Sequence, residues 1–193
     1  ALVANRVIVS LQEDWQVDGR TFAAGSVVSL DRDAVLADPQ NLSPTLVWEP
    51  GPREALESIA STKNRLILST LDNVRGRVWS YAPQAGGGWA AERLALPDNM
   101  ALGVSSVDDE SDRLFVSVAG FLTPSALYLA DAASGAAPEV VKTLKPQFAA
   151  PDHLVEQHEA TSSDGTKIPY FVVRPKDAPM DGSTPTLLNA YGG

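Results

Sequence analysis

Apolar residues gather in short runs of about four to eight residues, separated by glycine, proline, aspartate and asparagine. The runs are rich in β-branched and aromatic side chains, which is typical of β-strands and not of helices. The clearest are Val7–Leu11, Val27–Leu30, Arg65–Leu71, Val78–Tyr81, Arg113–Val118 and Ala126–Leu129. Only Arg32–Ala37 and Pro52–Ile59 are compatible with a helical turn, and neither has a convincing apolar stripe. The pattern therefore predicts an all-β chain.

The strand-like runs also repeat as groups. The stretch Arg65–Leu94 is similar to Arg113–Leu144, a step of 48 residues between their first residues, and Arg6–Leu30 is an earlier copy with a longer insertion. Units of about 40–50 residues with four short strands are typical of β-propeller blades, which bury their faces by stacking on neighbours. The repeat predicts about three four-stranded blades of an incomplete propeller over residues 1–150. An antiparallel sandwich with accidentally similar halves is the alternative.

The pattern changes after Leu144. Pro146–Pro151 is interpreted as a linker, because its prolines cannot donate to a β-ladder. Glu156–Pro175 is predicted to be a hairpin that turns at Ser163–Thr166. Thr186–Ala190 has the apolar pattern of a buried strand and leads into Tyr191-Gly192-Gly193. Residues 151–193 are thus predicted to begin a second domain.

Composition narrows the possible functions. The chain has 15 Lys and Arg against 24 Asp and Glu, a net charge of −9, which argues against nucleic-acid binding. It has no cysteine, so disulfides and thiolate metal sites are excluded, and no apolar stretch long enough for a membrane span. The N-terminus has no starting Met and no signal-peptide pattern, which suggests part of a longer protein. Composition does not indicate the cellular compartment, and no cofactor is predicted.

The tail resembles the beginning of the catalytic domain in the prolyl oligopeptidase family of serine peptidases. The resemblance rests on Ser163–Pro169, on Val173-Arg174-Pro175 and on Leu187–Gly193, in the order that the family has them. The segment Leu71–Arg77 also resembles a propeller segment of that family. The family implies a propeller that covers an α/β-hydrolase domain, so residues 151–193 are expected to be the first strands of that domain, truncated.

The resemblance also implies an activity, the hydrolysis of short peptides, typically after proline, by a Ser-Asp-His triad. In this family a tyrosine of the Tyr-Gly-Gly segment stabilises the oxyanion, and the matching residue is Tyr191. The alternative for Tyr191 is an aromatic residue that closes a buried strand. No Gly-x-Ser-x-Gly occurs, and in this fold all three triad residues follow the strand that ends the chain. The fragment alone is therefore expected to be inactive.

Other candidate residues are interpreted as structural. His153 and His158 are expected to lie on opposite faces of a strand, so they do not suggest a shared metal. The acidic residues from Asp108 to Asp112 are interpreted as a solvated turn, because they lack the spacing of a calcium loop. The arginines of Asp72–Arg77 are expected on a surface turn or, alternatively, facing the channel of the propeller or the other domain. Trp15, Trp48, Trp79 and Trp89 are expected to pack within the blades.

Two further hypotheses remain open. One is a non-catalytic propeller that binds or scaffolds a partner. The other is a related peptidase that cuts after basic residues or removes dipeptides. Because incomplete propellers leave unpaired sheet edges, the fragment is also expected to be poorly stable or to self-associate.

Overall fold

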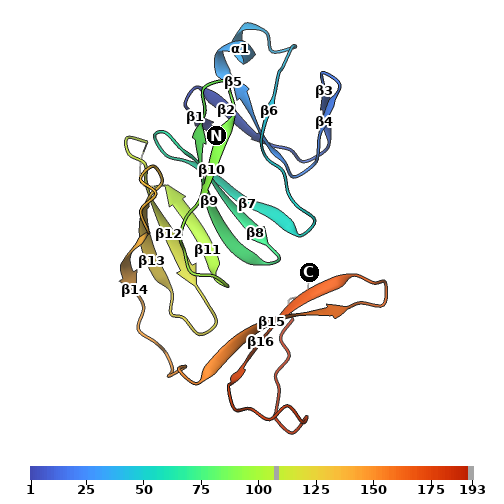
Figure 1. The fold of residues 1–193 in the computed structure, drawn as a ribbon, viewed down its shortest axis with the longest axis vertical. Helices are drawn as coiled ribbons and strands as arrows, with labels where there is room; N and C mark the ends of the chain where they lie inside the picture. The colour runs from blue at the N-terminus through green and yellow to red at the C-terminus, as the bar shows by residue number, and fades with distance from the viewer. Residues whose placement is uncertain (107–108, 191–193) are drawn as a thin grey trace. The chain divides into compact units, whose positions relative to one another are not determined.

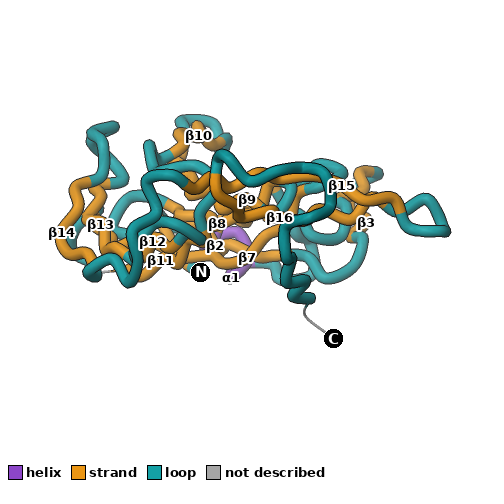
Figure 2. Tube along the Cα trace, turned by 90° about the horizontal axis from the view of Figure 1, so that it is seen from below, coloured by secondary structure: helices purple, strands orange, loops and turns teal. Residues whose placement is uncertain are grey.

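The computed structural model describes residues 1–106 and 109–190 and is built almost entirely of β-strands (Figures 1 and 2). Contacts divide the chain into two compact units, Ala1–Lys145 and Pro146–Gly193. The first unit contains three four-stranded antiparallel sheets, and the second contains a two-stranded hairpin. The predicted all-β fold with three four-stranded repeats is confirmed.

The first sheet has the strand order β1-β2-β5-β6. Its strands are β1 (Leu2–Val3), β2 (Arg6–Ser10), β5 (Val27–Asp31) and β6 (Thr45–Trp48). A small hairpin of β3 (Trp15–Val17) and β4 (Arg20–Phe22) is inserted between β2 and β5. The helix α1 (Arg32–Ala37) follows β5 and begins where Asp31 accepts hydrogen bonds from the amides of Asp33 and Ala34. The predicted helical turn at Arg32–Ala37 is therefore present.

The second sheet follows chain order. Its strands are β7 (Glu54–Ser61), β8 (Leu66–Asp72), β9 (Arg75–Pro83) and β10 (Trp89–Arg93). The suggestion of a helical turn at Pro52–Ile59 is wrong, because residues 54–61 form a strand that pairs with β8, with one register shift between Leu56 and Ser58. Leu56 and Ile59 of this strand pack against the apolar cluster that the first and second sheets form together. Their burial therefore depends on the neighbouring sheet.

The third sheet repeats the second. Its strands are β11 (Ala101–Ser106), β12 (Arg113–Ala119), β13 (Ala126–Asp131) and β14 (Glu139–Thr143), again in chain order. The repeated openings at Arg6, Arg65 and Arg113 fall at the start of the second strand of each sheet. Each sequence repeat therefore corresponds to one four-stranded sheet and begins at the same strand of that sheet.

The sheets stack through strands that are buried on both faces. Leu66 and Leu68 of β8 belong to the apolar cluster shared with the first sheet, which also contains Val27. Ile67, between them, belongs to the cluster shared with the third sheet, together with Leu114. Because side chains alternate across a strand, β8 supplies the core to both sides, which explains its uninterrupted apolar run. A two-sheet sandwich, the alternative from the sequence, is not what forms.

The four tryptophans pack within the blades, as predicted. Trp48, Trp79 and Trp89 lie against the cluster between the first and second sheets. The indole nitrogen of Trp89 also donates to Ser29 Oγ at 2.9 Å, which ties the outer strand of the second sheet to the first. Trp15 packs with Phe22 under the small hairpin.

Asp112 fastens the third sheet to the second. Its Oδ1 accepts hydrogen bonds from Thr62 Oγ1 at 2.8 Å and from the Asn64 amide at 2.7 Å, and its Oδ2 accepts from Asn64 Nδ2 at 2.8 Å. The interpretation of this acidic stretch as a solvated turn is therefore wrong for Asp112, although Asp109 and Glu110 are exposed. Asp108 lies outside the described residues.

Replacing Asp112 by alanine is expected to lower the free energy of unfolding by about 1–3 kcal/mol, because three donors of the 62–65 turn lose their acceptor. Chemical denaturation of the full-length protein measures the change, with Asp109→Ala as the matched control on the same turn. A loss of equal size in both variants would contradict the inter-sheet role.

The same contacts predict an acid sensitivity. Desolvation raises the pKa of Asp112, but the hydrogen bonds from Asn64 and Thr62 together outweigh it and hold the pKa below its ordinary value of 3.8. The carboxylate therefore contributes its full stabilisation above the ordinary value, and loses it as pH falls through the lowered one. Denaturation of the wild type and of Asp112→Ala between neutral and acidic pH is expected to show a shallower loss in the variant.

The second unit is a hairpin of β15 (His153–Thr161) and β16 (Lys167–Pro175), paired along their full lengths. Its turn closes with a hydrogen bond from the Ser162 amide to the carbonyl of Thr166, and Gly165 adopts a φ of +88°. A positive φ is accessible to glycine at little cost. The predicted hairpin is confirmed.

The predicted buried strand at Thr186–Ala190 does not form in this chain. These residues have no strand assignment, and the side chains of Leu187 and Leu188 are 92% and 89% exposed. The physical reason is that a strand is buried only against neighbouring strands, and the described residues supply none here.

Candidate functional site

The strand order places several loops at one end of the first unit. At this end β14 stops at Thr143 and the chain continues toward the second unit, so we call it the linker end (Figure 1). Because neighbouring strands of a sheet are antiparallel, the connection that leads to Ala101 and the loop before Ala126 both lie at this end of the third sheet. The Gly76 amide donates to the carbonyl of Met100 at 3.2 Å, which places the turn after Asp72 beside that connection. Loops carried by a rigid scaffold are the usual place for binding residues.

A network of ion pairs holds the 94–100 connection at the linker end. The side chain of Arg77 is only 9% exposed, and its Nη1 donates to Asp98 Oδ1 at 2.8 Å. Arg93 Nη2 donates to the same oxygen at 2.7 Å. The hydrogen bond from Arg93 and the charge of Arg77 lower the pKa of Asp98 below its ordinary value. The expectation of a surface turn is wrong for Arg77, whose side chain is buried in this network.

A cavity of about 390 Å³ lies at the linker end between the first and second sheets. Its lining includes Ser10, Leu11, Gln12, Pro50, Glu54 and Leu56. These residues come from the end of β2, from the connection between β6 and β7, and from β7 itself. The cavity combines apolar walls with a few polar groups, as ligand sites do.

Glu54 is the charged group of this cavity. It is half-buried, and its Oε2 accepts a hydrogen bond from the Gly51 amide at 2.9 Å, which fixes the carboxylate. Burial, and secondly the negative charge of Glu54, raise the pKa of the core residue Tyr81 to about 12. The sequence did not single out Glu54, because an isolated glutamate at the start of a strand carries no motif.

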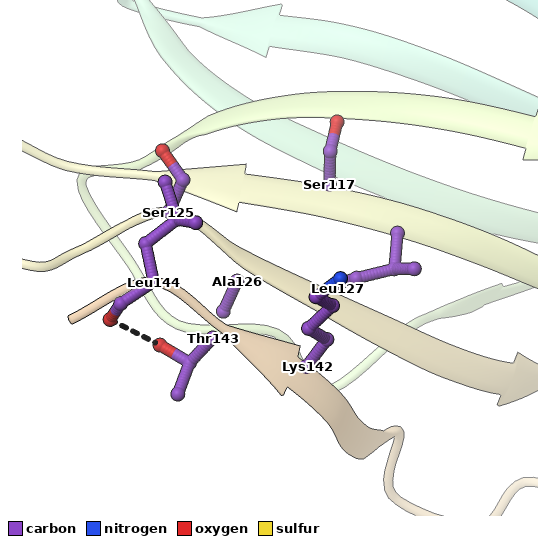
Figure 3. Close-up of a pocket in the computed structure, with 7 residues that line it drawn as sticks. All are labelled: Ser117, Ser125, Ala126, Leu127, Lys142, Thr143 and Leu144. Atoms are coloured by element: carbon purple, nitrogen blue, oxygen red, sulfur yellow. Dashed lines mark hydrogen bonds between the residues drawn. The ribbon is translucent and has the colours of Figure 1, made fainter.

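A second hollow, of about 220 Å³, lies on the third sheet (Figure 3). It is formed by Ser117, Leu127 and Lys142, on the face opposite to the one that packs on the second sheet. Figure 3 shows at its edge the hydrogen bond of 3.3 Å from Thr143 Oγ1 to the carbonyl of Leu144. The outer strand β14 beside it is exposed at all five residues.

On the second unit, polar side chains gather on one face of the hairpin. Arg174 donates two hydrogen bonds to Glu156, from Nε at 2.9 Å and from Nη2 at 3.2 Å. This contact is the main cause of the lowered pKa of Glu156. His158 lies beside Tyr170, with ring centroids 5.6 Å apart. The arrangement is that of a cross-strand cluster that stabilises a hairpin.

The two histidines do not form a catalytic or metal site in the part of the chain that the structure describes. Both lie on β15, five residues apart and thus on opposite faces, as predicted. His153 packs edge-on to Phe148, and its Nδ1 is buried without a hydrogen-bond partner. Among residues 1–106 and 109–190, no group of three metal-ligating side chains occurs, and no helix is long and apolar enough to cross a bilayer.

Tyr191, the one predicted catalytic residue, lies outside the described residues, and its role remains a prediction. The chain has no Gly-x-Ser-x-Gly, and in the described part neither histidine hydrogen-bonds to a serine. Within those residues the structure therefore forms no serine–histidine pair.

Comparisons with known proteins agree with this fold. Residues 15–143 match the family described as the N-terminal β-propeller domain of prolyl oligopeptidase. An uncharacterized peptidase of Sinorhizobium fredii is 43% identical over 189 residues, which are 97% of this chain and 26% of that protein. The structure of a post-proline cleaving enzyme from Rickettsia typhi has a TM-score of 0.80 and 31% identity, and the match covers 99% of this chain and 28% of that one.

A prolyl endopeptidase of Elizabethkingia miricola is 31% identical over 106 residues, 55% of this chain and 15% of that protein. The chain thus spans about a quarter of the length of the curated relatives that match almost all of it, 26% and 25%.

Proposed function

This chain belongs to the prolyl oligopeptidase family, and from that premise we propose that it is part of a serine peptidase that hydrolyses short peptides after proline. The observation that carries the proposal is the family match over residues 15–143, which coincides with the stacked four-stranded sheets. The resemblance of the tail to the beginning of the family's catalytic domain supports it, as does the relative that cleaves after proline.

In this proposal the two units have different tasks. Residues 1–150 supply propeller blades from the C-terminal part of the propeller, which restrict access to short, flexible peptides. Residues 151–193 begin the α/β-hydrolase domain, and the Ser, Asp and His of the triad lie outside this chain. A serine hydroxyl is a weak nucleophile until a histidine accepts its proton and a carboxylate orients that histidine, so the chain alone is expected to be inactive.

Tyr191 is the residue of this chain that we assign to catalysis. Attack on the scissile carbonyl develops negative charge on its oxygen, and a phenolic hydroxyl aimed at that oxygen stabilises the charge in the transition state. The two glycines that follow in the sequence allow the backbone to turn closely beside a substrate. The assignment rests on the match of the Tyr-Gly-Gly segment to the family motif.

The proposal predicts that the full-length protein cleaves an acetylated neutral peptide on the carboxyl side of its proline, and that a serine-directed fluorophosphonate abolishes the cleavage. The matched control is the same peptide with alanine in place of proline, which is expected to be cut far more slowly. Product masses identify the bond. The proposal fails if neither peptide is cut, and post-proline specificity fails if both are cut equally.

A non-catalytic propeller that binds a partner is the second candidate, because stacked four-stranded sheets fit it equally well. It predicts that no peptide is cleaved even at full length.

The expected self-association of the 193-residue chain is likewise a proposal. The strand that would carry it is β14, because Val140 and Val141 are 55% and 53% exposed at the edge of the third sheet.

A further inference from the structure

We propose that the cavity between the first and second sheets binds the positively charged group of a peptide, an N-terminal ammonium or a lysine or arginine side chain, at the carboxylate of Glu54. The inference rests on the proposed peptidase function and adds a substrate preference to it.

The carboxylate of Glu54 is fixed in position and is suited to bind a cation. One carboxylate oxygen, Oε2, accepts the Gly51 amide at 2.9 Å, and in the described part of the chain no lysine or arginine forms an ion pair with Glu54. The other oxygen, Oε1, therefore keeps its capacity to accept. A half-buried carboxylate has lost part of its hydration, so a charge-assisted hydrogen bond from an ammonium or guanidinium is favourable there.

The charge of the surrounding segments has the matching sign. Glu13, Asp14 and Glu49 stand within two residues of lining residues, and Arg53 is the only basic residue in the segments 10–14, 24–25 and 49–56. A concave site lined by a surplus of one charge raises the local concentration of oppositely charged ligands. An anionic ligand is disfavoured for the same reason.

The shape of the cavity fits part of a peptide. Its volume of about 390 Å³ is at the lower end of the range of about 300–1,000 Å³ for ligand pockets. Leu11, Pro50 and Leu56 provide apolar wall for the methylene stem of a side chain or for the first residue of a chain. The hollow around Lys142 carries no comparable inference, because nothing described covers that face of the third sheet.

The test compares the full-length wild type with Glu54→Gln on three proline peptides that differ only in charge. One has an acetylated N-terminus and no charge, one has a free N-terminus, and one is acetylated and carries a lysine. Glutamine keeps an acceptor for the Gly51 amide, so the loop is expected to remain folded. For Glu54→Gln, the KM of a cationic peptide is expected to rise about tenfold, which corresponds to about 1.4 kcal/mol of binding free energy, while its kcat is unchanged. Both KM and kcat for the neutral peptide are expected to stay as in the wild type.

The matched control is Glu57→Gln, which removes the same charge from an exposed position of the same strand and does not line the cavity. The inference is overturned if Glu54→Gln leaves every KM unchanged, if it raises KM for all three peptides alike, or if Glu57→Gln has the same effect. The cationic peptide whose KM rises shows whether the cavity binds the N-terminal ammonium or the lysine side chain.

The two proposals fail in different ways. If the wild type does not cleave the neutral peptide, the proposed function fails, and the cavity is then tested by fluorescence anisotropy with a lysine peptide that has a free N-terminus and a C-terminal label. Binding to the wild type that weakens about tenfold in Glu54→Gln supports the inference, and equal binding to both proteins overturns it.

Discussion

Replacing Tyr191 by phenylalanine in the full-length protein is expected to lower kcat for a proline peptide by about 10²–10³-fold, the usual effect of removing one oxyanion donor. KM is expected to change little, because the negative charge on the carbonyl oxygen exists only in the transition state and not in the bound substrate. Steady-state kinetics with one fluorogenic proline peptide separates the two constants.

Tyr170→Phe is the matched control for this experiment. Tyr170 lies on β16, is 44% exposed and contacts the ring of His158, so loss of its hydroxyl is expected to leave kcat nearly unchanged. A kcat for Tyr191→Phe within a few-fold of the wild type would contradict the oxyanion role and favour the alternative, an aromatic residue that closes a strand. An equal fall in both variants would indicate a general effect on the fold.

Replacing Leu114 by alanine is expected to lower the free energy of unfolding by about 2–5 kcal/mol, because it opens a cavity where two sheets meet. Leu114 is completely buried and belongs to the cluster with Ile67 and Val78 of the second sheet. Both sheets are rigid, so the surroundings collapse only partly into the space. Urea denaturation of the full-length protein, read as a midpoint shift at constant m-value, measures the loss.

The control for Leu114→Ala is Leu36→Ala on α1, where the side chain is 70% exposed and the change is expected to stay within about 0.5 kcal/mol. Similar losses at both positions would contradict the stacking of the sheets as the main source of stability. A fall of the m-value with Leu114→Ala would show that the blades no longer unfold together.

The stacked arrangement also explains how the residues at the linker end are held in place. The second sheet is buried on both faces by its neighbours, and the connection at the linker end is itself anchored in the core through Leu94 and Leu96. Glu54 begins β7 and Arg77 lies in β9, whereas Asp98 lies in the connection that Arg77 and Arg93 hold by ion pairs. Loops vary more readily than such a core, because the apolar residues of β8 and its neighbours hold the sheets together.

The sequence alone determined the strand content, the repeat of 48 residues and the hairpin of β15 and β16. These follow from local rules, since alternating apolar residues and an Asp-Gly turn specify strands and hairpins over a few residues. The Tyr-Gly-Gly ending also pointed to the family that the comparison with residues 15–143 then showed.

The tertiary structure alone decided what depends on contacts between distant residues. Residues 54–61 form a strand because β8 pairs with them, and Thr186–Ala190 forms none because the described residues place no strand beside it. Asp112 joins two sheets because Asn64, 48 residues earlier in the chain, donates to it. Glu54 lines a cavity because residues 10–12, 24–25 and 50 of the first sheet's loops line it together with the start of β7. No local pattern encodes such partners, so their roles appear only when the sheets are stacked.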